Sequence, residues 1–403
     1  MKKKKFVHWY ILSLRLAVQR ERCLVLLSAL DPEKVDIDLM VYQHTGEFMS
    51  LVPEYVNLLP EIPEYSCMLR PIRSIIKEGH IGIALRRLWA LYKHQQYIKT
   101  LTSEELSKDE SVFQYVVANV IDTLPSLEHL GYYDLAISFI APHNIVLNKV
   151  KAKKKVCWIH TDYSTIFVNR DLELPIWEGF DYIASISNDC TRAFVKTFPE
   201  LKDKILLIEN ILSPLFVRKQ ADLEDVSAEM PNKTGVTKIL SIGRFSTPKR
   251  FEAIPYYCSI MEKMRLNFKW YIVGYGDDSK IQAALEKYNM QHRIILLGKK
   301  VNPYPYIKAC DIYVQPSIYE GKSVTVREAQ ILYKPVVITN YPTAKSQVSS
   351  GLDGVIVPLD EQEIAKGIVR FIKNTVLRDT IIDYLHVHDY GNEVEVEKIY
   401  ALL

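Results

Sequence analysis

Short apolar runs recur along the first half of the chain, and stretches with helical periodicity separate them. The runs are residues 35–42, 133–140, 155–160, 180–187 and 205–208. Each is too short for a typical buried helix, and each predicts a strand buried on both faces. Such strands alternating with helices indicate a parallel sheet that helices cover on both sides. We therefore expect a Rossmann-like α/β domain over residues 1–215.

A second series of apolar runs begins at residue 238. Its members are residues 238–243, 269–274, 294–298, 312–314 and 335–339. They predict a second parallel-sheet domain, which we place at residues 238–380. Residues 216–237 are rich in charged residues, Pro, Ser and Asn and lack a strong period, so we expect a linker there. Residues 381–403 are expected to form a terminal helix.

Composition narrows the class of protein. The 403 residues carry a formal net charge of +3, which is too small to favour nucleic acid as the main partner. The six cysteines are scattered without a close pair, so neither a zinc site nor a disulfide framework is expected. No apolar run reaches the length of a membrane-spanning helix, and no cleavage site of small residues follows the N-terminus. These features predict a soluble cytoplasmic protein.

The most informative stretch is residues 319–329, which follows the predicted strand 312–314. The pattern changes to helix after Gly321, and Ser323 is placed to be the N-cap residue. Free backbone N–H groups at such a helix start form an anion site. These groups belong to Lys322, Ser323 and Val324, and Gly321 just before them is expected to bind the same ligand. Glu320 lies in the loop, while Glu328 lies roughly 7–8 Å along the helix at 1.5 Å per residue. One ligand could contact all three features.

A second candidate site follows the predicted strand 238–243. The strand ends at Gly243, and Pro248 stands where a helix can begin. Two cations, Arg244 and Lys249, flank this turn. A guanidinium can bind a diphosphate through two parallel hydrogen bonds, and an ammonium adds a compact charge. This turn therefore predicts a site for a diphosphate.

His160 follows directly on the predicted strand 155–160. Polar side chains at the carboxyl ends of parallel strands face the ligand crevice of open α/β sheets. A structural role for a lone histidine is the alternative. The position of His160 at the strand end, within residues 158–163, favours a role in function.

These motifs together resemble those of retaining GT-B glycosyltransferases of family 4, the glycosyl transferases group 1, of the polysaccharide-assembly type. The resemblance implies two Rossmann-like domains facing a central cleft, with the terminal helix returning to the N-terminal domain. It implies a nucleotide-sugar donor, with uridine the favoured base, and a glycan or lipid-linked acceptor on the side of the N-terminal domain. It implies no cofactor and no metal ion.

The resemblance also assigns roles to the candidate residues. Arg244 and Lys249 would hold the donor diphosphate in place of a metal ion, with Gly243 allowing close approach. Glu328 would accept hydrogen bonds from the ribose diol. Glu320 and His160 would contact the transferred sugar, and departure and attack would occur on the same face of the sugar, with retention. A GT-B sugar-nucleotide epimerase and a non-catalytic sugar-nucleotide binder are the alternatives.

The binder alternative rests on an atypical N-terminus. The family places a Gly-rich loop after its first strand, but no glycine precedes Gly46 in this chain. Residues 17–23 instead predict a charged helix. One permitted set of codons for residues 17–23, shifted by one base, reads Gly-Gly-Ser-Glu-Arg-Ala-Leu, which resembles the loop of the family. A compensated frameshift across residues 8–24 is therefore one hypothesis, and genuine divergence with impaired catalysis is the other.

Two basic segments suggest contacts beyond the active site. Residues 81–99 predict an amphipathic helix with basic and aromatic side chains, which could lie peripherally on the cytoplasmic face of a membrane. An ordinary surface helix with its tryptophan packed on the domain is the alternative. Residues 149–155 contain five lysines and are expected to be a solvated connection between strands, which would strengthen any attraction to a membrane.

Overall fold

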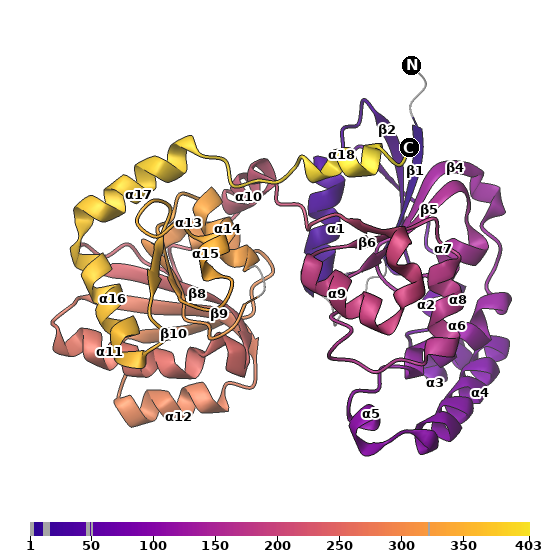
Figure 1. Cartoon of the computed structure of the whole chain (residues 1–403), viewed down its shortest axis with the longest axis horizontal. Coiled ribbons are helices and arrows are strands. Elements are labelled where there is room, and N and C mark those ends of the chain that lie inside the picture. Colours follow the sequence, from indigo (N-terminus) through magenta and orange to yellow (C-terminus); the bar gives the residue numbers. More distant parts are fainter. Residues whose placement is uncertain (1–3, 11–16, 46–48, 50, 321–322) are drawn as a thin grey trace. The chain divides into compact units, whose positions relative to one another are not determined.

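The computed structural model describes residues 4–10, 17–45, 49, 51–320 and 323–403. Contacts divide the chain into two compact units. Unit 1 comprises Met1–Ile211 and Glu393–Leu403, and unit 2 comprises Leu212–Asn392. Figure 1 labels their elements.

Unit 1 is built on a parallel sheet. Its strands in the described part of the chain are β1 (Lys4–Tyr10), β2 (Val35–Val41), β3 (Val56–Leu58), β4 (Tyr132–Ser138), β5 (Lys151–Ile159), β6 (Tyr182–Ser185) and β7 (Ile205–Leu207). Their order is β3-β2-β1-β4-β5-β6-β7, and every pair is parallel. Successive residues Leu135, Ala136 and Ile137 are fully buried, so both faces of β4 are covered. The order is that of a doubly wound sheet.

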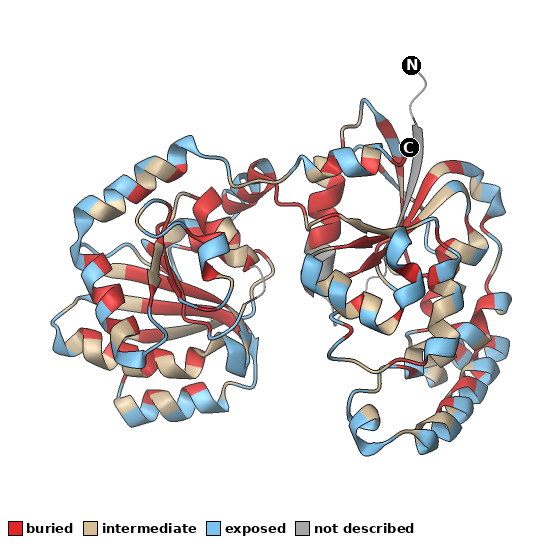
Figure 2. Ribbon diagram, viewed as in Figure 1, coloured by how far each residue is buried: buried red, intermediate tan, exposed pale blue. Residues whose placement is uncertain are grey.

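Helices cover the faces of this sheet. They are α1 (Ala17–Ala29), α2 (Pro63–Ser66), α3 (Ile72–Lys77), α4 (Ile81–Tyr97), α5 (Ser103–Ser107), α6 (Val112–Val120), α7 (Asn144–Lys149), α8 (Arg170–Glu178), α9 (Asn188–Thr197) and α18 (Glu395–Tyr400). Single turns of 3₁₀-helix occur at η2 (Ile98–Thr100), η3 (Ile121–Thr123) and η4 (Glu128–Leu130), and a longer one at η5 (Pro199–Lys204). Figure 2 shows buried residues concentrated on the strands and on the inner sides of the helices.

Unit 2 has a second parallel sheet. Among the described residues its strands are β8 (Thr237–Phe245), β9 (Phe268–Gly276), β10 (Ile294–Gly298), β11 (Ile312–Gln315), β12 (Val336–Thr339) and β13 (Val355–Val357), in the order β10-β9-β8-β11-β12-β13. The helices are α10 (Pro214–Ala221), η6 (Thr247–Lys249), η7 (Phe251–Ala253), α11 (Ile254–Lys263), α12 (Ser279–Tyr288), α13 (Tyr304–Ala309), α14 (Val324–Ile331), α15 (Ala344–Gln347), α16 (Glu361–Lys373) and α17 (Thr375–Val387). Both units are thus Rossmann-like.

Residues 216–237, expected to be a linker, belong to unit 2. Ser213 caps α10 by accepting a hydrogen bond from the Phe216 N–H at 3.2 Å, and Pro214 follows at the first helical position. Phe216 and Val217 are buried. Further along, Glu229 pairs with Lys300 at 2.6 Å, which ties this stretch to the domain. Ser213 followed by Pro214 is a sequence pattern that predicts a helix start. The charged composition of the following residues favoured a linker instead.

Residues 381–403, expected to be one terminal helix, are divided between the units. Ile381 and Leu385 of α17 are buried in the core of unit 2. The chain then breaks near Gly391, and α18 packs on unit 1, where the Asp31 N–H donates to the Tyr400 hydroxyl oxygen at 2.6 Å. The close packing here requires a glycine, because a Cβ at Gly391 would lie 2.6 Å from Pro214 Cδ.

Candidate active site

The loop after β8 and the loop after β11 meet at one edge of the unit 2 sheet. The Ile318 N–H donates to the Pro248 carbonyl oxygen at 2.9 Å, which joins the two loops through their backbones. Lys249 Nζ then lies 2.6 Å from Glu320 Oε1. Their side chains are 23% and 11% exposed, so this ion pair is partly shielded from water. Two residues predicted separately from the sequence are therefore in direct contact.

Gly243 makes room for the lysine. A Cβ at this position would lie 3.3 Å from Lys249 Cε and 3.3 Å from Phe251 Cζ. A side chain at this position would require the lysine stem or the phenyl ring to move by a few tenths of an ångström. Arg250, directly after η6, adopts the left-handed conformation (φ 57°), which turns the chain sharply behind Lys249. Arg244 lies near the end of β8, which runs two residues beyond the predicted strand, and it is exposed.

A series of hydrogen bonds between buried polar side chains leads to Glu320 and holds its carboxylate. Ser317 Oγ donates to Glu320 Oε1 at 2.6 Å, and Gln315 Nε2 donates to Ser317 Oγ at 2.8 Å. The Tyr313 hydroxyl donates to Gln315 Oε1 at 2.7 Å. Tyr313, Gln315 and Ser317 are fully buried. Sequence reasoning missed this row, although alternate polar residues at the end of an apolar strand are an available signal.

The start of α14 is held by a glutamine. Ser323 occupies the predicted N-cap position with extended backbone, but its hydroxyl makes no capping bond. Instead, its N–H donates to Gln347 Oε1 at 3.2 Å, and the Tyr341 hydroxyl donates to the same oxygen at 2.8 Å. An anion at this N–H would share it with Gln347. Val324 begins the helix, while Gly321 and Lys322, also predicted to bind the donor, lie outside the described residues.

Glu328 is the fifth residue of α14 and is only 2% exposed. The Tyr304 hydroxyl donates to its Oε1 at 3.3 Å. A buried carboxylate is stable only where hydrogen-bond donors reach it. Tyr304 was not predicted from the sequence, and it comes from α13, near the same edge of the sheet.

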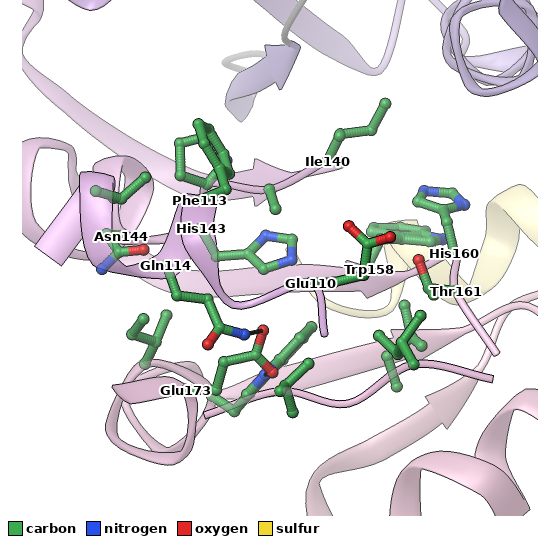
Figure 3. Close-up of a pocket in the computed structure, with 18 of the residues that line it drawn as sticks. Glu110, Phe113, Gln114, Ile140, His143, Asn144, Trp158, His160, Thr161 and Glu173 are labelled. Carbon is green, nitrogen blue, oxygen red and sulfur yellow. Dashed lines mark hydrogen bonds between the residues drawn. The ribbon is translucent and has the colours of Figure 1, made fainter. Parts of the chain in front are cut away.

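Unit 1 carries a cavity of about 450 Å³ at the carboxyl ends of β4 and β5 (Figure 3). Its walls are largely apolar and include Phe113, Trp158 and Trp177, and His160 lies at its rim. Burial lowers the pKa of His160 to about 4, against a hydrogen bond to the Phe139 backbone, so the imidazole is neutral at pH 7. In the described part of the protein, no group hydrogen-bonds to its Nε2. This nitrogen is therefore a buried acceptor without a partner among the described residues.

Further polar groups line the same cavity and were missed by sequence reasoning. Glu173 accepts hydrogen bonds from Gln114 Nε2 at 2.6 Å, the Tyr163 hydroxyl at 3.1 Å and Trp177 Nε1 at 3.2 Å. Burial raises its pKa, and these three donors oppose the rise. His143 Nδ1 lies 2.8 Å from Ser138 Oγ, and burial lowers its pKa to about 3. The cavity thus combines apolar walls with a small set of fixed polar groups, as ligand pockets do.

The predicted residues form two groups. Unit 2 holds Gly243, Arg244, Lys249, Glu320, Ser323, Val324 and Glu328, and unit 1 holds His160. Direct contact is present between Lys249 and Glu320. Within the described ranges, no three His, Cys, Asp or Glu side chains are grouped so as to hold a metal ion. None of the described helices combines the length and apolar character needed to cross a bilayer.

Solved structures are similar to this chain over nearly its whole length. A glycosyltransferase from Rickettsia africae matches with a TM-score of 0.64 at 14% identity, covering 100% of this chain and 98% of that one. Anabaena Alr3699/HepE, solved in complex with UDP and glucose, also has a TM-score of 0.64 at 14% identity and covers 99% and 98%. The chain has the GT-B fold. The fold class predicted from the sequence is therefore confirmed.

Residues 224–386 match the family Glycosyl transferases group 1. The amylovoran biosynthesis glycosyltransferase AmsK of Erwinia amylovora is 22% identical over 274 residues, which cover 60% of this chain and 67% of that protein. The N-acetylgalactosamine-N,N'-diacetylbacillosaminyl-diphospho-undecaprenol 4-alpha-N-acetylgalactosaminyltransferase of Campylobacter jejuni is 23% identical over 226 residues, which cover 55% and 59%.

The first curated relatives are matched over only 37%, 67% and 59% of their own length. The matched family segment lies in unit 2 and contains Arg244, Lys249, Glu320 and Glu328. The comparisons therefore relate unit 2, which carries the Lys249–Glu320 pair, to the glycosyl transferases group 1.

Proposed function

We propose that this chain is a retaining glycosyltransferase of family 4 that moves a sugar from a UDP-sugar to a glycan or lipid-linked acceptor. The observation that carries the proposal is the Lys249–Glu320 ion pair beside the start of α14, inside the segment that matches group 1. A cation, a carboxylate and a helix start at one sheet edge provide contacts for the diphosphate and sugar of one donor.

The donor would be bound by unit 2. Arg244 and Lys249 would neutralise the charge that builds on the departing diphosphate, without a metal ion, together with the backbone N–H groups of residues 322–324. Glu328 would accept from the ribose diol. Support for uridine comes from Alr3699/HepE, which was solved with UDP. It also comes from a similar Escherichia coli protein that is named as a UDP-Gal transferase. That protein is 29% identical over 90 residues, which cover 22% of this chain and 23% of that protein.

In the proposed reaction, the bond between the sugar anomeric carbon and the diphosphate oxygen breaks, and the acceptor hydroxyl oxygen bonds to that carbon on the same face. The hydroxyl proton passes to the leaving diphosphate. Glu320 would contact hydroxyls of the transferred sugar, and Lys249 holds its carboxylate in place. His160, neutral at pH 7, would act as a hydrogen-bonding group and not as a cation.

The cavity of unit 1 is our proposed acceptor site. It offers apolar walls for sugar faces or a lipid stem, and fixed polar groups at Glu173 and His143 for hydroxyls. The Campylobacter jejuni and Escherichia coli proteins are named for acceptors that carry diphosphoundecaprenol. We propose an acceptor of that lipid-linked class, and with it a cytoplasmic protein that associates peripherally with the inner face of a membrane.

One incubation separates this function from its rivals. The purified protein is given labelled UDP-sugars with an undecaprenyl-diphosphate-linked sugar, and the products are resolved chromatographically. Label in the lipid fraction, with the donor's anomeric configuration, is expected. An epimerised sugar nucleotide would favour the epimerase. Binding without any product would favour the impaired binder that the absent Gly-rich loop suggests, although the comparisons do not favour either alternative.

A further inference from the structure

The helix α4 is apolar on two opposite sides. Its inner side, with Ile83, Ala84 and Ala90, is buried against unit 1. Its outer side carries five large exposed side chains, which we call the α4 stripe. They are Ile81, Leu85, Leu88, Trp89 and Tyr92, with exposed fractions of 57%, 61%, 49%, 54% and 54%. At 3.6 residues per turn these positions share a sector roughly 100° wide. Figure 2 shows exposed positions along this helix.

Polar contacts fix the helix α4, and with it the α4 stripe, to the rest of unit 1. His94 Nε2, on the inner side, lies 2.9 Å from Asp109 Oδ2. Arg87 Nη1 donates to the Cys67 carbonyl oxygen at 2.6 Å, which ties the helix to the segment before α3. Trp89 and Tyr92 stack with ring centroids 5.3 Å apart. Unit 1 therefore holds an apolar surface in place, facing solvent, and an apolar patch of this kind marks an interaction site.

Charge along the sequence around the stripe is predominantly positive. The helix has no Asp or Glu, and residues 69–100 contain seven Lys and Arg but one carboxylate, Glu78, which pairs with Arg70. Arg86 and Lys93 flank the stripe on the side of α6, where both reach Asn119, at 3.3 Å and 3.0 Å. The exposed Arg73 and Lys77 belong to the neighbouring α3.

We infer that the α4 stripe docks unit 1 onto an anionic lipid bilayer, with the stripe among the acyl chains and the flanking cations at the headgroups. An apolar face with Trp and Tyr, bordered by Lys and Arg, is the composition of a helix that lies in a membrane interface. A second copy of the chain fits poorly, because a two-fold contact through this face would bring its cations against each other.

The helix α6 packs against α4 and also lines the cavity. The helix α6, on which Arg86 and Lys93 rest, also supplies Phe113, Gln114 and Val117 to the cavity wall, and Leu69, just before α3, lines the same cavity. Docking would therefore hold the proposed acceptor site close to the lipid surface from which a lipid-linked acceptor comes. This last step rests on the proposed function, whereas binding to vesicles without substrate does not.

The test is cosedimentation of the full chain with vesicles of phosphatidylcholine, with and without phosphatidylglycerol. We expect binding to the anionic vesicles that falls with added salt. The variant Leu85→Ser/Leu88→Ser/Trp89→Ser should bind at least about tenfold more weakly. Val376→Ser/Val387→Ser, which changes two of the most exposed apolar residues of unit 2, is the control and should bind as the unchanged protein does.

Charge is tested separately. Arg86→Glu/Lys93→Glu should lower the partition coefficient at least about 25-fold, since each lysine or arginine near the surface contributes about fivefold. Lys280→Glu/Lys287→Glu on α12 makes the same change in net charge in unit 2 and should have a much smaller effect. Equal loss in both variants would mean general charge attraction and would overturn the docking surface.

Trp89 provides a direct readout of insertion. Among tryptophans whose side chains are described, Trp89 is exposed, whereas Trp158, Trp177 and Trp270 are buried. Its emission should shift to the blue on anionic vesicles and be quenched by brominated acyl chains, and Trp89→Phe should abolish both changes. Absence of quenching, or a concentration-dependent dimer that the triple serine variant abolishes, would overturn the proposal. All variants change exposed side chains, and unchanged melting curves would show that they fold.

Discussion

Replacing Lys249 by alanine removes the cation that the structure places 2.6 Å from Glu320. Two consequences follow. A donor diphosphate would lose one of its two proposed cationic partners. In addition, the Glu320 carboxylate would keep the Ser317 hydroxyl at 2.6 Å but lose its ion-pair partner in a partly shielded position.

The two consequences have different magnitudes. Loss of one preorganised contact to a developing charge costs about 2–4 kcal/mol, so kcat/KM for the donor should fall about 30- to 1000-fold. Breaking a fully buried ion pair costs about 3–5 kcal/mol of unfolding free energy. Because the two side chains are 23% and 11% exposed, we discount this to about 1–2 kcal/mol. Activity should therefore fall far more than stability.

Initial rates against UDP-sugar concentration and urea unfolding of the same samples measure both quantities. Lys366→Ala is the matched control, because Lys366 also pairs with a glutamate of unit 2, at 2.9 Å, but both side chains are well exposed. It should change neither quantity by more than about 1 kcal/mol. Adding Glu320→Gln to Lys249→Ala should recover part of the lost stability without recovering activity. A Lys249→Ala enzyme with lowered stability but kcat/KM within about twofold of the unchanged enzyme would refute the reasoning and make the pair purely structural.

Glu328→Gln should raise the donor KM, since a ribose contact is made in both ground and transition states, while Glu320→Gln should mainly lower kcat; unchanged kinetics in both would contradict the assigned roles. Chelation by EDTA should leave most of the activity if Arg244 and Lys249 take the place of a metal ion, as we propose, and complete loss in EDTA would disprove metal independence. The pKa of His143 is about 3 in the folded protein, whereas a histidine in the unfolded chain has a pKa of about 6.5. Between these values the unfolded state binds a proton that the folded state does not. The free energy of unfolding should therefore fall as the pH drops from about 6.5 toward 3. His143→Gln should remove on the order of 4 kcal/mol of this dependence in urea titrations across that range, and an unchanged profile would show that His143 does not titrate as a buried group.

Most strands could be predicted because parallel strands buried on both faces leave continuous apolar runs. The run 312–314 corresponds to β11, and the run 205–208 to β7. Residues 149–155 were misjudged, since β5 begins at Lys151. Over Lys151–Lys154 the strand pairs with β4, and pairing with β6 begins at Val156. Lys151 and Lys153 are exposed, so their charged ends remain in water although their backbone belongs to the strand.

Part of the candidate site could also be predicted, because its residues follow local sequence patterns. Glu320 and Lys249 lie in loops whose flanking residues form strong local patterns. The groups that support them carry no such pattern, because they meet only through folding. Gln347 reaches Ser323 across 24 residues, and Tyr304 reaches Glu328 across the same separation. The cavity of unit 1 likewise joins Gln114 to Glu173 across 59 residues, which no local signal encodes.

Unit 2 is one unbroken segment whose two ends meet. The Leu212 N–H donates to Asn392 Oδ1 at 2.6 Å, and the Asn392 N–H donates to the Leu212 carbonyl oxygen at 3.2 Å. Unit 1, by contrast, needs both ends of the chain. This is the connectivity of an inserted module, since chain ends that lie together permit domain insertion. Joining Ile211 to Glu393 by a short loop should leave a foldable unit 1, and recombination at these two points would exchange unit 2, the proposed donor module, while unit 1 stayed the same.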